Sequence, residues 1–184
     1  MVGHSEVLKR VLSELNTAGV EHMLVGSLAA SAHGYIRDTH DLDFVVVLDR
    51  KTVQLLAERM SKDFYFDVEG AEEAVEQSDM FNIIHYDSMV KVGFWPLRND
   101  EFGKTQFSRR RASTVWGIPA YVESPEDTIL SKLLWNKISP SDRQTSDVAG
   151  ILLIKKDELD YDYLTTWAER QGVLDVLRKL IEDN

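Results

Sequence analysis

Two aspartates separated by one residue open an apolar segment near residue 40. Asp41 and Asp43 begin the run DLDFVVVL at 41–48, whose branched and aromatic residues are typical of a β-strand. Alternate side chains of a strand point to the same face, so the two carboxylates lie on one side of the sheet, about 6.5–7 Å apart at Cα. Carboxylates at that separation can hold a hard divalent cation between them, and Mg²⁺ or Mn²⁺ is the expected cofactor.

A glycine–serine pair precedes the two acids. Gly26 and Ser27 follow the apolar residues 23–25, and thirteen residues separate Ser27 from Asp41. This order predicts a strand over 22–25, a tight turn, and a short alanine-rich helix over 28–33. The Ser27 hydroxyl and the backbone N–H groups after Gly26 face the region of the two acids and suit a phosphate. The alternative is a turn glycine followed by a strand with two solvated acids.

Together, the glycine–serine turn and the Asp-x-Asp strand resemble the signature of the nucleotidyltransferase superfamily, which has the polymerase β-like fold. The resemblance implies an α/β (α+β) fold, in which a mixed sheet with flanking helices is followed by a C-terminal helical part. It also implies binding of a nucleoside triphosphate with Mg²⁺ and transfer of a nucleotidyl group to the hydroxyl of an unidentified small molecule, protein or RNA. Asp41 and Asp43 are then catalytic metal ligands. Gly26 and Ser27 hold the β- and γ-phosphates. Arg37 either contacts phosphate or caps the turn.

Two motifs in the last third of the chain extend this resemblance. The segments EDTILSKL at 126–133 and RQTSDVAGIL at 143–152 resemble downstream motifs of the abortive-infection-type (AbiEii-like) nucleotidyltransferases. That branch implies that Lys132 contacts the nucleotide phosphates and that Asp147 is an auxiliary catalytic acid. The alternative is that Arg143 and Asp147 form an exposed ion pair on the surface of one helix without a functional role, because they have the i, i+4 spacing of such a pair.

One position departs from the pattern of the superfamily. The resemblance implies a third acid, in a Lys-x-Asp arrangement on a strand beside 41–48, but the matching stretch is Lys91-Val92-Gly93. A glycine inside a strand marks a bulge or a close approach by another group. With the third acid replaced by Gly93, the second hypothesis is a catalytically impaired nucleotide- or protein-binding module. Such a module fits a toxin–antitoxin or regulatory component with a cognate protein partner.

The elements that position these residues fall into two parts, an α/β core at 1–123 and a helical subdomain at 124–184 that closes the cleft. Ser5 is the expected N-cap of the first helix, and Ser124 with Pro125 begins a later one. Residues 69–78 predict a surface helix or loop, and residues 99–110 a helical or irregular segment. Period-2 and period-3.6 patterns predict the other elements. The further expected strands are 64–68, 81–86, 89–97, 112–116 and 119–123, and the helices are 5–18, 49–61, 124–135, 141–154, 160–170 and 173–181.

Composition restricts the functional classes. The 184 residues include 43% hydrophobic residues and no cysteine, which excludes disulfides and thiolate metal sites. No apolar run reaches the roughly 18–20 residues that span a bilayer, and no signal-peptide core is present, so we expect a cytoplasmic protein without a membrane partner. The formal net charge of −10 opposes nucleic-acid binding, and the arginines at 109–111 favour a solvated or ion-paired face. A local basic patch of these arginines with Arg98 and Lys104 is the alternative.

Overall fold

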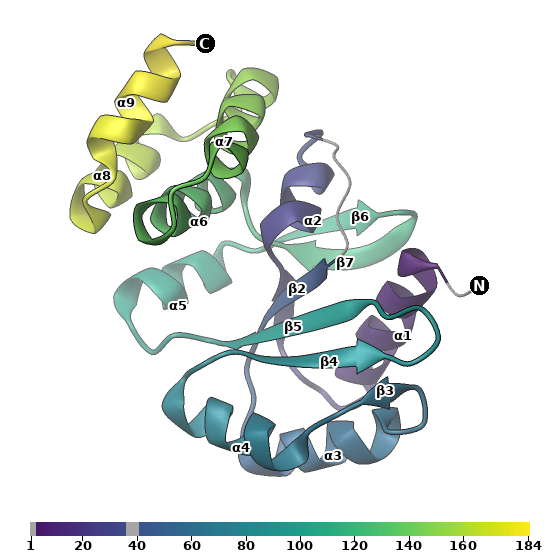
Figure 1. The fold of residues 1–184 in the computed structure, drawn as a ribbon. Coiled ribbons are helices and arrows are strands. Elements are labelled where there is room, and N and C mark those ends of the chain that lie inside the picture. Colours follow the sequence, from purple (N-terminus) through teal and green to yellow (C-terminus); the bar gives the residue numbers. More distant parts are fainter. Residues whose placement is uncertain (1–2, 36–40) are drawn as a thin grey trace.

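A seven-stranded mixed sheet lies at the centre of the structure, a computed structural model that describes residues 3–35 and 41–184 (Figure 1). Within these residues the strand order is β3-β4-β5-β2-β1-β7-β6. The strands are β1 (His22–Leu24), β2 (Asp41–Val46), β3 (Phe64–Tyr65), β4 (Phe81–His85), β5 (Lys91–Pro96), β6 (Arg111–Val115) and β7 (Ile118–Val122). The helices are α1 (His4–Thr17), α2 (Gly26–Ala32), α3 (Arg50–Met60), α4 (Val68–Gln77), α5 (Glu101–Ser108), α6 (Pro125–Ile138), α7 (Asp142–Lys155), α8 (Tyr161–Gln171) and α9 (Leu174–Glu182).

The strand that carries the two aspartates lies in the middle of the sheet. β2 pairs in parallel with β5 and antiparallel with β1, and β1 pairs in parallel with β7. In the β2–β5 pair, Asp43 lies directly opposite Gly93. The prediction that the 41–48 and 89–97 strands are neighbours is therefore confirmed.

One face of this sheet forms the larger hydrophobic core. Leu42 and Phe44 of β2 alternate with the two aspartates, and they are fully buried in a cluster that includes apolar residues of α1 and α3. Phe44 stacks on Phe94 of the next strand, with ring centroids 5.8 Å apart. Since the apolar face is packed, the aspartates project to the opposite face, as the alternation predicts.

The C-terminal helices form a second cluster beside the sheet (Figure 1). Its buried residues come mainly from α6 to α9, with Ala30 and Phe102 added from the preceding part of the chain. Ser124 begins α6 as predicted, because its hydroxyl accepts a hydrogen bond from the Asp127 N–H. The α/β class with a C-terminal helical part is confirmed. No helix in the described part of the chain has the length and apolarity needed to cross a membrane.

Several predicted boundaries differ from those of the structure by one to three residues, among them the end of α6 at Ile138 rather than residue 135 and the end of β2 at Val46 rather than residue 48. Three of these differences are explained by local features of the chain. α1 begins at His4 with Gly3 as its N-cap, not Ser5, because the Glu6 side chain accepts a hydrogen bond from the Gly3 N–H at 2.9 Å. The strand expected at 64–68 ends at Tyr65, since the Asp67 side chain accepts from the Gly70 N–H and caps α4. The short helix α2 starts at Gly26 rather than at residue 28, which brings the glycine–serine pair into its first turn.

Candidate functional site

A cavity of about 490 Å³ lies on the polar face of the sheet, between the sheet and helix α6. Its floor includes Asp41 and Asp43 of β2, and one wall is formed by Lys132 and Trp135 of α6. Gly26, Ser27, Trp95, Gln106, Glu123, Ser131 and Arg143 are further lining residues. Six of the seven residues predicted for the site therefore have known positions, and five of them line this cavity. The sixth, Asp147, contacts it through Lys132. Arg37 lies outside the described residues.

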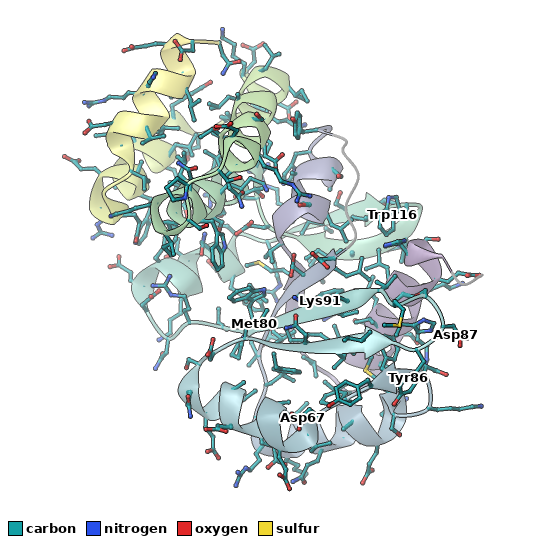
Figure 2. All side chains as sticks on the ribbon, in the orientation of Figure 1. Asp67, Met80, Tyr86, Asp87, Lys91 and Trp116 are labelled. Atoms are coloured by element: carbon teal, nitrogen blue, oxygen red, sulfur yellow. The ribbon has the colours of Figure 1, made fainter. Side chains whose placement is uncertain are left out.

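Asp43 is the more enclosed of the two aspartates. Burial raises the pKa of its carboxyl, and the charge of Asp41 raises it further. The Trp95 indole N–H and the ammonium groups of Lys91 and Lys132 act in the opposite direction. Lys91 lies opposite Asp41 at the start of β5 and is labelled in Figure 2. Two carboxylates this close repel each other when both are charged, and a divalent cation between them relieves that repulsion. These residues therefore fit Mg²⁺ or Mn²⁺.

Gly26 brings the main chain against this carboxylate. It has a φ of +64°, a conformation that favours glycine, and a Cβ at this position would lie 3.2 Å from Asp43 Oδ2. The next strand holds the turn in place, because the Val25 N–H donates to the Asp43 carbonyl oxygen at 3.0 Å. The expected phosphate turn and the expected metal ligands thus lie side by side, and Ser27 lines the same cavity.

Gly93 also lies against Asp43, on the other side. A Cβ at this position would lie 2.6 Å from Asp43 Oδ1, 3.5 Å from Asn82 Oδ1 and 3.6 Å from Trp95 Nε1. β5 keeps a continuous parallel register with β2, so the glycine makes no bulge there. The close approach that glycine in a strand predicts is therefore the approach of the Asp43 carboxylate itself.

Lys132 and Asp147 form an ion pair between α6 and α7. Lys132 is 4% exposed, Asp147 is 1% exposed, and Nζ lies 2.5 Å from Asp147 Oδ2. Lys132 is thus a buried residue of the cavity wall and not an exposed surface lysine. The alternative interpretation of Asp147, an exposed i, i+4 ion pair with Arg143, is wrong, because the Asp147 carboxylate is buried and pairs with Lys132 of the preceding helix. The two C-terminal motifs therefore meet in one buried contact.

Glu123, the last residue of the strand predicted over 119–123, is a further polar residue of this cavity. It is 2% exposed and lies between β7 and α6. Its Oε1 accepts a hydrogen bond from the Ser131 hydroxyl at 2.7 Å, whereas its Oε2 has no hydrogen-bond partner. Burial, with a smaller contribution from the charge of Asp127, raises the pKa of Glu123 to about 8. An acid directly before a helix N-cap was the available signal, but its burial depends on tertiary packing.

The arginines at 109–111 are held by acids of other elements. The Arg109 guanidinium also lies over the Tyr163 ring, 3.7 Å from its centroid. Their ion pairs join Arg109 to Glu126 and Asp127 at 3.2 and 3.3 Å, Arg110 to Glu21 at 2.9 Å and Arg111 to Glu126 at 3.4 Å. The segment is the ion-paired face that the sequence favoured. Within residues 3–35 and 41–184, no group of three or more His, Asp or Glu side chains is placed to hold a metal ion.

No protein-family model matches this sequence, and no curated protein matches it. Among solved structures, the chain is similar to the lincomycin-bound lincosamide antibiotic adenylyltransferase LnuA, with a TM-score of 0.57 and 12% identity over 83% of this chain and 98% of that one. It is also similar to a nucleotidyltransferase-like antigenic protein from Paracoccidioides brasiliensis, with a TM-score of 0.52 and 12% identity over 95% and 91% of the two chains. For the antibiotic-resistance factor ANT(2'')-Ia the TM-score is 0.52, with 14% identity over 94% and 95%. These similarities show that the chain has the nucleotidyltransferase (polymerase β-like) fold; the AbiEii-like assignment stays a prediction.

Proposed function

We propose that the protein is a nucleotidyltransferase that binds a nucleoside triphosphate with Mg²⁺ or Mn²⁺ in this cavity and transfers the nucleotidyl group to an acceptor hydroxyl. One observation carries the proposal: the Gly26 turn lies against the Asp43 carboxylate, with 3.2 Å between Oδ2 and the position of a Cβ. A phosphate held by the turn is then beside the ligands of the cation. The fold shared with an antibiotic-resistance factor and with a lincosamide antibiotic adenylyltransferase supports the same class of reaction.

Each polar residue of the cavity has a role in this proposal. Asp41 and Asp43 hold the cation, which neutralises phosphate charge and orients the group that is transferred. Gly26 and Ser27 contact the β- and γ-phosphates through backbone N–H groups and a hydroxyl. Lys132 adds positive charge, and Asp147 fixes its ammonium group in the wall of the cavity. Catalysis then rests on positioning and on stabilisation of developing charge.

The aromatic wall and the volume of the cavity indicate which class of acceptor it could take. Trp95 and Trp135 lie in edge-to-face contact in the cavity wall, with ring centroids 5.4 Å apart, and they offer apolar surface to a base or to an acceptor. A small-molecule hydroxyl suits the restricted volume of about 490 Å³ better than a folded macromolecule. Proteins and RNA with a flexible hydroxyl-bearing end are the other acceptor classes.

Calorimetric titration with each of the four nucleoside triphosphates, with and without Mg²⁺ or Mn²⁺, tests this function. The double variant Asp41→Asn/Asp43→Asn should lose cation-dependent binding, because both carboxylate ligands are removed. Asp87→Asn, in the exposed β4–β5 turn labelled in Figure 2, is the matched control and should bind as the wild type does. Equal affinities of the double variant and the wild type would refute the site.

The second candidate function is binding without turnover, as a regulatory or toxin–antitoxin component with a protein partner. The observation that favours it is Gly93, since β5 supplies no carboxylate beside Asp43 and the space for one is taken. Transfer of label from an α-labelled triphosphate separates the two candidates. Binding without any transferred or released nucleotide supports the second.

A further inference from the structure

Four residues lie in one row across the sheet on the face of the cavity. Asp43 is opposite Gly93, the Val25 N–H donates to the Asp43 carbonyl oxygen, and the Glu123 N–H donates to the Leu24 carbonyl oxygen. Since Leu24 pairs with Val122 in parallel register, Glu123 is level with Val25 and hence with Asp43. Gly93 is one strand spacing from Asp43 on one side, and Glu123 is two spacings away on the other, about 10 Å at Cα.

Glu123 is held so that one carboxyl oxygen remains available. The Ser131 hydroxyl donates to Oε1, and the Gln106 side chain in turn donates to Ser131 Oγ at 3.1 Å. These contacts fix the orientation of the carboxyl group. The Thr128 hydroxyl of the same cavity also lies near the carboxyl, but Oε2 has no partner with the geometry of a hydrogen bond. Buried polar atoms nearly always have a hydrogen-bond partner, so an oxygen left without one at a cavity is a position for an atom of a ligand.

The geometry points to Glu123 as the catalytic residue that accepts the proton of the attacking hydroxyl, an inference that rests on the proposed nucleotidyl transfer. The O–H bond of the acceptor breaks and its proton goes to Oε2. The electron pair of the acceptor oxygen forms the bond to the α-phosphorus, and the bond to the bridging oxygen breaks with release of pyrophosphate. An attacking oxygen about 3–3.5 Å from phosphorus and a base about 2.6–3.2 Å from that oxygen place the base roughly 6 Å beyond the phosphate. The Cα atoms of Asp43 and Glu123 are about 10 Å apart. Their side chains shorten this distance, which leaves room for an acceptor hydroxyl between a phosphate at Asp43 and the Glu123 carboxyl.

The surroundings of Glu123 agree with a base and not with a cation ligand. No three-acid group that could hold a metal forms among the described residues, so Glu123 does not join Asp41 and Asp43 around one ion. The groups that face its carboxyl are the Ser131 and Thr128 hydroxyls, which lower its pKa, and Asp127 and Lys132 of α6, whose charges act in opposite directions. The His33 ring contacts its carbonyl oxygen at 2.8 Å. Burial raises the pKa of Glu123 to about 8, near the range in which a general base works best.

The test uses Glu123→Gln, which keeps an oxygen for the Ser131 hydroxyl but cannot take a proton. Pyrophosphate release from the four nucleoside triphosphates with Mg²⁺ is measured across pH 6–9, with water as the acceptor. We expect about 100-fold slower release by the variant, in line with the typical effect of a general base. The wild-type rate should rise with pH to about 8, and this rise should be absent in the variant. Glu21→Gln, exposed at the edge of β1, is the matched control and should behave as the wild type does.

Binding and folding controls keep the outcomes separate. Calorimetry should give the same triphosphate affinity for Glu123→Gln and the wild type, because the base contacts the acceptor and not the phosphates. Failure of the wild type to bind any triphosphate would overturn the proposed function itself. Binding with equal pyrophosphate release in both proteins, zero included, would overturn only the role of Glu123. If Glu123→Gln does not fold, Glu123→Asp serves instead, and a rate and pH profile equal to the wild type would also overturn the role.

Discussion

The Asp43 carboxylate occupies the space beside Gly93 in which a side chain of that residue would lie. The two residues are paired across β2 and β5, and only 2.6 Å would separate Oδ1 from a Cβ at position 93. An acid at this position would therefore have to displace the carboxylate of a proposed cation ligand. Glycine at position 93 is therefore what allows the Asp43 carboxylate to lie where it does.

Gly93→Asp should destabilise the protein without a cation, and added Mg²⁺ should restore part of the loss. Gly93→Ala is the control for the steric effect, which forces the Asp43 carboxylate to move and costs about 1–3 kcal/mol. The additional effect of the aspartate is repulsion between carboxylates, and it should shrink as Mg²⁺ binds. Urea unfolding with increasing Mg²⁺ measures both. If the two variants respond to Mg²⁺ in the same way, the added carboxylate is not beside the cation.

Lys132→Met should lower the free energy of unfolding by about 3–5 kcal/mol, because it removes the ammonium group that pairs with the buried Asp147 carboxylate. The double variant Lys132→Met/Asp147→Leu removes both charges and should recover most of this loss. Its triphosphate affinity should stay low, whereas its affinity for the corresponding nucleoside should match the wild type. A double variant that binds triphosphate normally would show that Lys132 has only a structural role.

Arg109→Ala should destabilise the contact between the sheet and the C-terminal helices by about 2–4 kcal/mol. The change removes one of two arginines that pair with the buried Glu126 carboxylate, the arginine that pairs with the buried Asp127 carboxylate, and the contact with the Tyr163 ring. Arg111→Ala is the control, because its guanidinium is half exposed and such pairs contribute about 0–1 kcal/mol. Equal shifts in the urea midpoint of the two variants would contradict the proposed importance of the Arg109 contacts.

The stability difference between Glu123→Gln and the wild type should depend on pH. In the unfolded chain Glu123 loses its proton near its ordinary pKa of 4.5, whereas in the folded protein it keeps it up to about pH 8. The unfolded state binds fewer protons in this interval, so the wild type should lose stability relative to the variant as pH rises from about 4.5 to 8, and no further above 8. Chemical unfolding of both proteins at pH 4.5, 6, 7 and 8 measures the difference. A constant difference would mean that the folded-state pKa of Glu123 is not raised.

Local patterns were sufficient to predict the centre of the fold. Alternation in 41–48 set the face of the aspartates, and the Ser124–Pro125 pair fixed the start of α6. The neighbouring position of the 89–97 strand followed from the resemblance to a known fold. Where the side chain of Asp67 competes with a strand for the backbone, the pattern of apolar residues misplaced the boundary.

The remaining parts of the site depend on contacts that the spacing of residues does not reveal. Lys132 and Asp147 are fifteen positions apart on different helices, and the angle between those helices decides their pairing. Glu123 directly follows a strand, and it becomes a buried residue of the cavity because α6 packs beside it and the Ser131 hydroxyl of that helix donates a hydrogen bond to its carboxyl. In both cases the contact joins residues on different elements, so the packing of those elements, and not the local pattern, determines it.

Helix α6 supplies the Ser131 hydroxyl and the Lys132 ammonium group, whereas the turn at Gly26 and both aspartates come from segments made much earlier on the ribosome. While residues beyond Ser124 are still inside the exit tunnel, the emerging chain presents two neighbouring carboxylates with neither the lysine nor the aromatic wall of Trp135. In the proposed function, the phosphate turn and the cation ligands are thus made first, and the cavity is complete only when the helices that follow the sheet have docked.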